Sequence, residues 1–166
     1  ACACVTALTL SGLPTRRFCF EAFLPREKKE RTAVRDALKT ETRTIILYEA
    51  PHHLKKTLAE LLETLGDRKL TLCRELTKKH ETVKASTLTE AIAYYEENEP
   101  RGEYVLVLAG KSMEALAEEA RQSFEAMSLK EHMAFYEEQG IPRKDAMKLV
   151  AKDRGVSKRD IYNALL

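Results

Sequence analysis

The sequence predicts an α/β domain with a sheet of about five strands, flanked by helices and followed by a small helical extension. Short apolar runs typical of buried strands alternate with amphipathic helical segments as far as Gly110. The run at 44–48 leads through Pro51 directly into a helix, as strands and helices join in α/β proteins. After Gly110 only helical patterns follow. We therefore expect two parts, residues 1–110 and 111–166.

The composition is that of a soluble globular protein. The chain has 166 residues, 44% hydrophobic and 33% charged, which is long enough to bury a core. It has no apolar run long enough to span a bilayer and no signal-peptide pattern, so we expect a cytoplasmic protein. Cys2, Cys4, Cys19 and Cys73 lie in apolar contexts, and we interpret them as reduced packing residues.

The first elements begin within an apolar pattern. Ala1 opens the chain inside a helical repeat without an initiator Met, so we expect a piece of a longer chain. That helix should end near Ser11, before a glycine and a proline. Residues 17–23 alternate and are aromatic, which predicts a strand with Phe18, Phe20 and Ala22 on one face.

The remaining elements of the first part follow in order. Residues 26–39 are charge-dense and predict an amphipathic helix, which is either a solvated face or a surface that steers RNA phosphates. The central strand at 44–48 leads into a helix that ends at Gly66. Thr87 and Glu90 have capping-box spacing for a helix to about Glu97. Further strands are expected at 69–75, 81–86 and 104–109, the last buried on both faces.

The junction at Tyr48 and Glu49 is the expected ligand site. A strand that ends there and leads into a helix places a ring, a carboxylate and unpaired N–H groups at the carboxyl edge of a sheet. His52 and His53 are adjacent in the first helical turn and diverge, so they do not form a two-histidine metal face. We predict no metal site.

The second part should contain four helices, at 112–127, 128–140, 142–154 and 157–166. The last two, joined by residues 155–157, resemble a helix-turn-helix. Residues 142–166 hold seven Lys and Arg against three acids, a local charge of +4. This is either a phosphate-binding surface or a solvated helical face. The RNA-binding candidates are Arg143, Lys144, Lys148, Lys152, Lys158 and Arg159.

Several motifs in a fixed order carry a family resemblance. Residues 48–54 read Tyr-Glu-Ala-Pro-His-His-Leu, residues 101–107 read Arg-Gly-Glu-Tyr-Val-Leu-Val, and related stretches lie at 4–18, 23–26 and 74–81. The order resembles the ribosomal RNA small subunit methyltransferase I family, a bacterial branch of the tetrapyrrole methylase superfamily. Such enzymes methylate the 2′-hydroxyl of a cytidine in small-subunit rRNA with S-adenosylmethionine. The resemblance covers essentially the whole chain.

The resemblance implies a two-domain enzyme with the methyl donor in the cleft between its domains. This chain would be the second domain, with a mixed sheet, and the first domain's glycine-rich loop is absent. The implied partners are small-subunit rRNA or the 30S subunit, the missing N-terminal domain and a second copy in a homodimer. Cys2 departs from the commoner Ser. The implied donor-binding residues are Cys2, Ala3, Tyr48, Glu49, Arg74, Glu75, Leu76, Gly102 and Glu103.

The chemistry of these residues leaves alternatives open. A ribose diol suits a carboxylate, for which Glu49, Glu75 and Glu103 are candidates. Glu75 or His80 could remove the proton from the ribose hydroxyl, and so could a group in the missing half. Equally, Glu49 could serve only the helix dipole, Tyr48 could be a half-buried strand aromatic, and the residues at 74–75 could pair with neighbours.

Three functional hypotheses therefore remain. The first is the C-terminal half of an rRNA 2′-O-methyltransferase that is inactive without its other half. The second is a corrin or porphyrin precursor methylase of the same superfamily, which would not require the basic helical tail. The third is a non-enzymatic nucleic-acid-binding module whose activity lies in the C-terminal helices.

Overall fold

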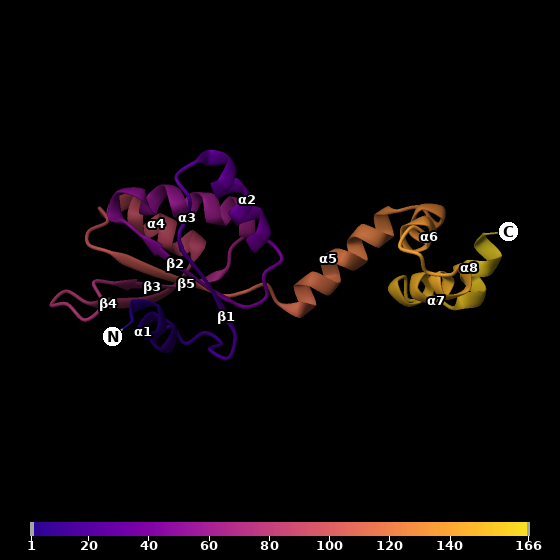
Figure 1. Ribbon diagram of the computed structural model, residues 1–166, viewed down its shortest axis with the longest axis horizontal. Coiled ribbons are helices and arrows are strands. Elements are labelled where there is room, and N and C mark those ends of the chain that lie inside the picture. Colours follow the sequence, from indigo (N-terminus) through magenta and orange to yellow (C-terminus); the bar gives the residue numbers. More distant parts are fainter. Residues whose placement is uncertain (1, 166) are drawn as a thin grey trace. The chain divides into compact units, whose positions relative to one another are not determined.

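The computed structural model describes residues 2–165, which divide into two compact units (Figure 1). The first unit ends at Ser112 and the second begins at Met113, two residues beyond the boundary expected from the sequence. The first is an α/β unit and the second is entirely helical. No helix among the described residues combines the length and the apolar character needed to cross a bilayer.

A mixed five-stranded sheet forms the centre of the α/β unit, as predicted. Its strands are β1 (Phe18–Phe23), β2 (Thr44–Glu49), β3 (Lys69–Arg74), β4 (Thr82–Thr87) and β5 (Tyr104–Leu108), in the spatial order β1-β2-β5-β3-β4. Only the β1–β2 pair is parallel, while β5 pairs antiparallel with both β2 and β3. The ends of β2 and β3 therefore lie on either side of the start of β5.

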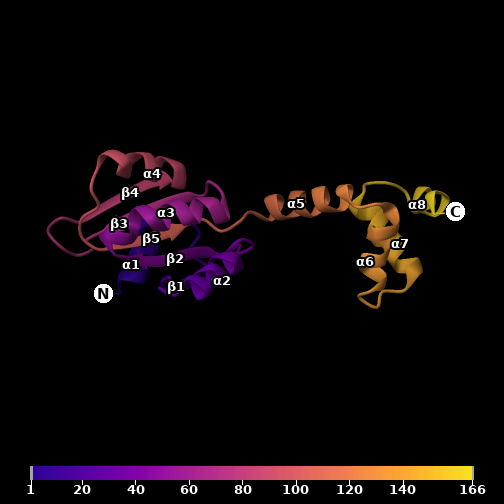
Figure 2. The same cartoon turned by 90° about the horizontal axis from the view of Figure 1, so that it is seen from above.

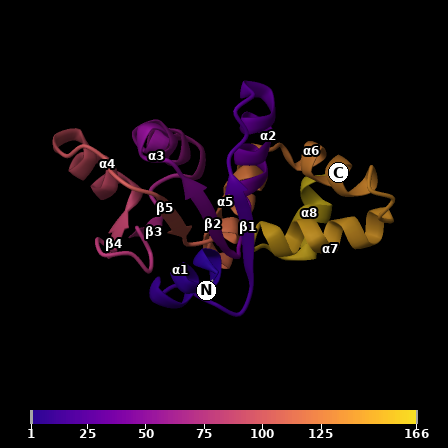
Figure 3. The same cartoon turned by 60° about the vertical axis from the view of Figure 1, so that its left-hand side comes forward.

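Helices cover both faces of this sheet. Figure 3 shows α1 (Ala3–Leu10) on one face and α3 (Pro51–Leu65) and α4 (Leu88–Glu97) on the other. The larger core lies under α2 (Lys28–Leu38), α3 and α4, where Leu54 and Leu58 pack with strand residues such as Leu106. The smaller core joins α1 to the opposite face through Cys4, Ala7 and Leu8. All five residues of β5 are buried, as expected for a strand covered on both faces.

Local signals set the helix ends. Pro51 occupies the first turn of α3, and Gly66, with a φ of 76°, ends that helix. Thr87 and Glu90 form the predicted capping box of α4. Two charged residues of α2, Arg31 and Arg35, do not point freely into solvent, because they reach across to α3. Arg31 Nε lies 2.6 Å from Glu60 Oε2, and Arg35 Nη1 donates to the Glu60 carbonyl.

The prediction that Ala22 shares a face of β1 with Phe18 and Phe20 is wrong. Phe20 pairs with Ile46 in β2, but the register then shifts, so that Ala22 pairs with Leu47 and Phe23 with Tyr48. Ala22 has a φ of 52°, in the left-handed region that one type of bulge uses. Because one extra residue is inserted, Phe23 replaces Ala22 on the face of Phe18 and Phe20. The bulge therefore brings a third aromatic ring to this face.

Up to residue 165 the second unit has four helices, as predicted: α5 (Met113–Ala126), α6 (Leu129–Glu137), α7 (Arg143–Asp153) and α8 (Lys158–Ala164). Figure 2 shows α6, α7 and α8 gathered at the end of α5. Capping boxes begin α6 at Ser128 and α8 at Ser157. The core is small and contains Met133, Ala146, Val150, Ala151 and Ile161.

A polar network lies inside this helical unit. The His132 ring is fully buried and stacks on Phe124, with ring centroids 4.2 Å apart. Its Nε2 lies 3.2 Å from Asp153 Oδ2, which also accepts the hydroxyl of Tyr136 at 2.6 Å. Arg154 donates from Nε to His132 Nδ1 and from Nη2 to the carbonyls of Phe124 and Met127. These side chains satisfy one another and fasten α5, α6 and α7 together.

Candidate functional site

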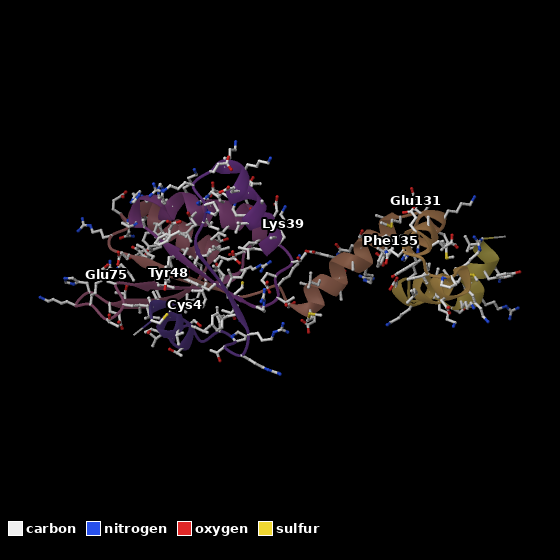
Figure 4. The ribbon with its side chains drawn as sticks, viewed as in Figure 1. Cys4, Lys39, Tyr48, Glu75, Glu131 and Phe135 are labelled. Atoms are coloured by element: carbon white, nitrogen blue, oxygen red, sulfur yellow. The ribbon has the colours of Figure 1, made fainter. Side chains whose placement is uncertain are left out.

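A pocket of about 340 Å³ lies at the edge of the sheet where β2 and β3 end and β5 begins. The first residue of α1 and the turn after β3 complete its wall. Six of the predicted site residues line it: Ala3, Tyr48, Glu49, Glu75, Leu76 and Glu103. Figure 4 shows Cys4, Tyr48 and Glu75 toward this end of the unit. The three candidate carboxylates Glu49, Glu75 and Glu103 thus lie around one hollow.

Three predicted residues do not line the pocket. Cys2 is the exposed N-cap residue of α1, and its carbonyl accepts the backbone N–H of Thr6. Arg74 lies on the opposite face of β3, in a separate hollow with Leu72, and donates to the carbonyl of His80 at 3.3 Å. Gly102 lies against the side chain of Glu75.

Tyr48 is fixed by aromatic rings and by the start of α1. Phe20 and Phe23 contact its ring edge to face, with centroids 4.9 and 5.7 Å away. The backbone N–H of Cys4 donates to its hydroxyl at 3.1 Å, which satisfies one of the unpaired donors of that helix. Burial raises the pKa of the Tyr48 phenol, so it stays protonated at neutral pH. Tyr48 therefore provides a fixed, neutral wall with a hydroxyl.

Glu49 is largely turned away from the pocket. Its side chain is 5% exposed, and the two carboxylate oxygens accept the N–H of Ala50 and the hydroxyl of Thr57. Ala50 is the N-cap residue of α3 and Thr57 lies two turns into that helix. Glu49 thus stabilises the junction of β2 and α3. This role is close to the alternative in which Glu49 interacts only with the N-terminus of the helix.

Glu75 occupies a strained turn. Its φ is 52° and that of Thr77 is 64°, in the left-handed region that non-glycine residues rarely adopt. Glu75 Oε1 accepts the N–H of Glu103 at 2.9 Å and the ammonium of Lys78 at 3.1 Å. These donors, the N–H first, hold the pKa of the Glu75 carboxyl below its ordinary value. A carboxylate with a lowered pKa is a weaker general base, which argues against that role for Glu75.

The residue that joins the two carboxylates was not among the predicted site residues. Lys78 lies between Glu75 and Glu103, 3.1 Å from the first and 2.9 Å from the second. Its position within the 74–81 motif was the available signal. The other candidate base, His80, is exposed in the loop between β3 and β4 and is not among the pocket-lining residues.

The predicted RNA-binding residues lie on the surface of the helical unit. Lys144, Lys148 and Lys152 are exposed and spaced by four residues along α7, away from its core residues Ala146 and Val150. Some of the positive charge is compensated. Arg143 lies 3.5 Å from Glu137, and Lys148 lies 2.8 Å from Asp145. Lys158 and Arg159 begin α8.

Comparison with known families assigns residues 1–92 to the Tetrapyrrole (Corrin/Porphyrin) Methylases. The chain belongs to the tetrapyrrole methylase family. Two curated bacterial relatives carry the name Ribosomal RNA small subunit methyltransferase I. The protein from Bacillus subtilis is 44% identical over 98% of this chain and 55% of its own length. That from Halalkalibacterium halodurans is 45% identical over 97% of the chain and 55% of its own length.

The chain spans about half the length of the curated relatives it matches. Among solved structures, the methyltransferase CobJ resembles 65% of this tetrapyrrole methylase chain and 47% of its own, at 18% identity and a TM-score of 0.49.

Proposed function

We propose that this chain is the C-terminal part of an S-adenosylmethionine-dependent enzyme that methylates a ribose 2′-hydroxyl in small-subunit rRNA. The observation that carries the proposal is the pocket at the ends of β2 and β3, because membership of a methylase family coincides there with a lining suited to a nucleoside-type donor. The names of the relatives support the rRNA substrate. We propose that the whole enzyme is a cytoplasmic homodimer acting on rRNA or the 30S subunit.

The pocket residues fit the chemistry of the donor. Ala3, Cys73 and Val105 provide a small apolar wall of the kind that an adenine ring requires. On the polar side, Glu103 has an 80% exposed side chain and is the carboxylate best placed to accept a ribose diol, since Glu49 is engaged by α3. Glu75 positions Glu103 by accepting its N–H. Lys78 keeps both carboxylates close together.

S-adenosylmethionine, when bound, supplies a methyl group on a positively charged sulfur. The residues of this chain then bind and orient, because positioning contributes much of the acceleration in such transfers. Tyr48 holds the start of α1 against the sheet and narrows the pocket, while Glu75 and Glu103 provide negative charge near a cationic donor. The pocket lining described in residues 2–165 includes no histidine, so we propose that the base comes from outside this chain.

The helical unit is proposed to bind RNA phosphates through the exposed face of α7 and the start of α8. Lys144, Lys148 and Lys152 present charge along one helix face, which suits a phosphate backbone. The buried polar network keeps that face rigid, because it locks α7 to α5 and α6. Contacts of this type position the substrate without reading its sequence.

A substrate comparison tests the proposal. The full-length protein is incubated with radiolabelled S-adenosylmethionine and either 30S subunits or a porphyrin precursor. We expect label in the 2′-O position of rRNA, and label only in the macrocycle would overturn the proposal in favour of the second family chemistry.

The residue assignment is tested separately. In the full-length protein, Glu103→Ala should weaken the binding of S-adenosylmethionine about tenfold in calorimetric titration, because one charge-assisted interaction is lost. Glu97→Gln, an exposed change on α4, is the control. Unchanged donor binding in Glu103→Ala would remove Glu103 from the site. The 166-residue chain alone should be inactive, and full activity from it would contradict the proposed two-part enzyme.

A further inference from the structure

A second and larger pocket of about 810 Å³ lies at the start of α3, beside the donor pocket. It is formed by the end of β1, the turn into α2 and the first two turns of α3. Phe23, Glu49 and Ala50 line both pockets. The two hollows are therefore neighbours around the end of β2.

Basic side chains dominate the wall of this second pocket. Arg26, Arg31, His52, His53 and Lys56 line it, and Glu49 is the only acidic residue among its lining residues within 2–165. The charge of Glu49 is directed into α3, where Thr57 and the N–H of Ala50 bind it. The wall presented to a ligand is thus cationic.

The cations differ in how freely they can bind a ligand. Arg31 is held by Glu60 and Thr57, so it contributes charge from a fixed position. Lys56 has a 70% exposed side chain and only a distant ion pair, 3.9 Å from Glu60. Arg26 is exposed and has no ion pair within residues 2–165. Arg26 and Lys56 are therefore the donors available to an anion, and the first turn of α3, whose N-cap Ala50 has no side-chain cap, adds its positive dipole end.

An exposed aromatic ring stands between the two pockets. Phe23 is 59% exposed, although it contacts Tyr48 along one edge. A ring that is supported on one side and open on the other is a platform for stacking a base. The arrangement in order is a donor pocket, an aromatic platform and a cationic pocket.

We infer that the cationic pocket at the start of α3 binds the backbone phosphates next to the target ribose, with Phe23 stacking on an unpaired base. This inference rests on the proposed function and adds the site where the RNA substrate binds. Arg26 and Lys56 bind phosphate oxygens, and the ribose between the stacked base and the phosphates faces the donor pocket. Single-stranded RNA has this combination of flat base and regularly spaced anions, whereas a macrocycle with carboxylates would need the stacking surface without a chain of phosphates.

Salt-dependent RNA binding tests the inference in the full-length protein. Binding of a single-stranded RNA oligonucleotide from the methylated region is followed by fluorescence anisotropy at several salt concentrations. The double variant Arg26→Ala/Lys56→Ala should bind about tenfold more weakly, and the slope of log affinity against log salt should fall by about 0.7 for each lost phosphate contact. Phe23→Leu should weaken binding without changing that slope, because stacking releases no counterions.

Two controls separate this inference from the proposed function. Lys55→Ala removes a neighbouring lysine of α3 that pairs with Glu99 and does not line the pocket, so affinity and slope should stay as in the wild type. Donor binding by calorimetry should be unchanged in the double variant. A double variant with the salt slope of Lys55→Ala would overturn the phosphate site while rRNA methylation by the wild type still stood. Absence of methylation by the wild type would instead overturn the proposed function, and this inference with it.

Discussion

Polar side chains of the α/β unit meet at an open pocket, whereas those buried in the helical unit bind one another. At the sheet edge, Glu75 and Glu103 are joined by Lys78 and line a hollow of about 340 Å³. In the helical unit, Arg154 and Asp153 both bond to His132, and their contacts stay within the same three helices. The first arrangement leaves groups free for a ligand, and the second does not.

Polar residues thus have different roles in the two units: they line a pocket in the α/β unit and link helices in the helical unit. In the α/β unit the apolar cores on both faces of the sheet supply stability, so strand ends can carry strained and charged residues. Among the residues that the structure describes, the core of the helical unit has five buried hydrophobic residues, and its polar network links α5, α6 and α7.

The largest effect on stability is expected at Arg154, which tests whether the buried polar network of the helical unit is structural. Arg154→Met keeps the aliphatic stem but leaves the carbonyls of Phe124 and Met127 and the ring of His132 without their donor. We expect the helical unit to lose about 3 kcal/mol of stability. Hydrogen exchange should show faster exchange in α6 and α7 and no change in β2 and β5. Lys148→Met, an exposed change on the same helix, is the control, and equal protection in both variants would show that the network is not structural.

Substitution of Gly102 tests whether Glu75 shapes the pocket of the α/β unit. Its φ is 76°, and a Cβ built on it would lie 2.5 Å from Glu75 Cγ. Gly102→Ala should cost about 1–2 kcal/mol for the left-handed backbone and should also displace Glu75, which weakens donor binding in the full-length protein. Gly12→Ala is a matched control, with a φ of 70° and no atom within 4 Å of its Cβ. Both variants should lower the melting temperature, but only Gly102→Ala should lower donor affinity; equal affinities would mean that Glu75 does not shape the pocket.

Much of this architecture was predictable because its signals are local. The capping box at Thr87 fixes the start of α4 through contacts three residues apart, and it is present as predicted. Ser128 and Ser157 begin α6 and α8 in the same way. The buried strand β5 is a continuous apolar run.

The spacing of residues did not specify which way side chains point, because that depends on partners distant in sequence. Tyr48 and Glu49 are adjacent on β2, so alternation sends them to opposite faces. Glu49 still lines the pocket, but its carboxylate oxygens accept the N–H of Ala50 and the hydroxyl of Thr57. Arg74 is turned from the pocket for the same reason, because its neighbour Cys73 faces it. The bulge in β1 and the bridging role of Lys78 depend on tertiary register and a left-handed turn, which spacing alone does not specify.

Acid sensitivity is the smallest expected effect, and it should appear in the helical unit. Burial holds the pKa of His132 below its ordinary value of 6.5, outweighing the attraction of Asp153, while Arg154 acts in the same direction as burial. The unfolded chain then binds a proton more readily than the folded one, so stability is intact above pH 6.5 and is lost as the pH falls toward the folded pKa.

Amide protection factors, corrected for the intrinsic pH dependence of exchange, should therefore decrease in α6 and α7 between pH 7.5 and 5. The decrease should be absent in His132→Gln, which keeps a polar side chain but cannot take up the proton. The surrounding groups Asp153, Tyr136 and Arg154 are unchanged in that variant, so a decrease of the same size would assign the sensitivity to them. Greater protection in acid would mean that the charge of Asp153 outweighs burial and that the network favours a protonated His132.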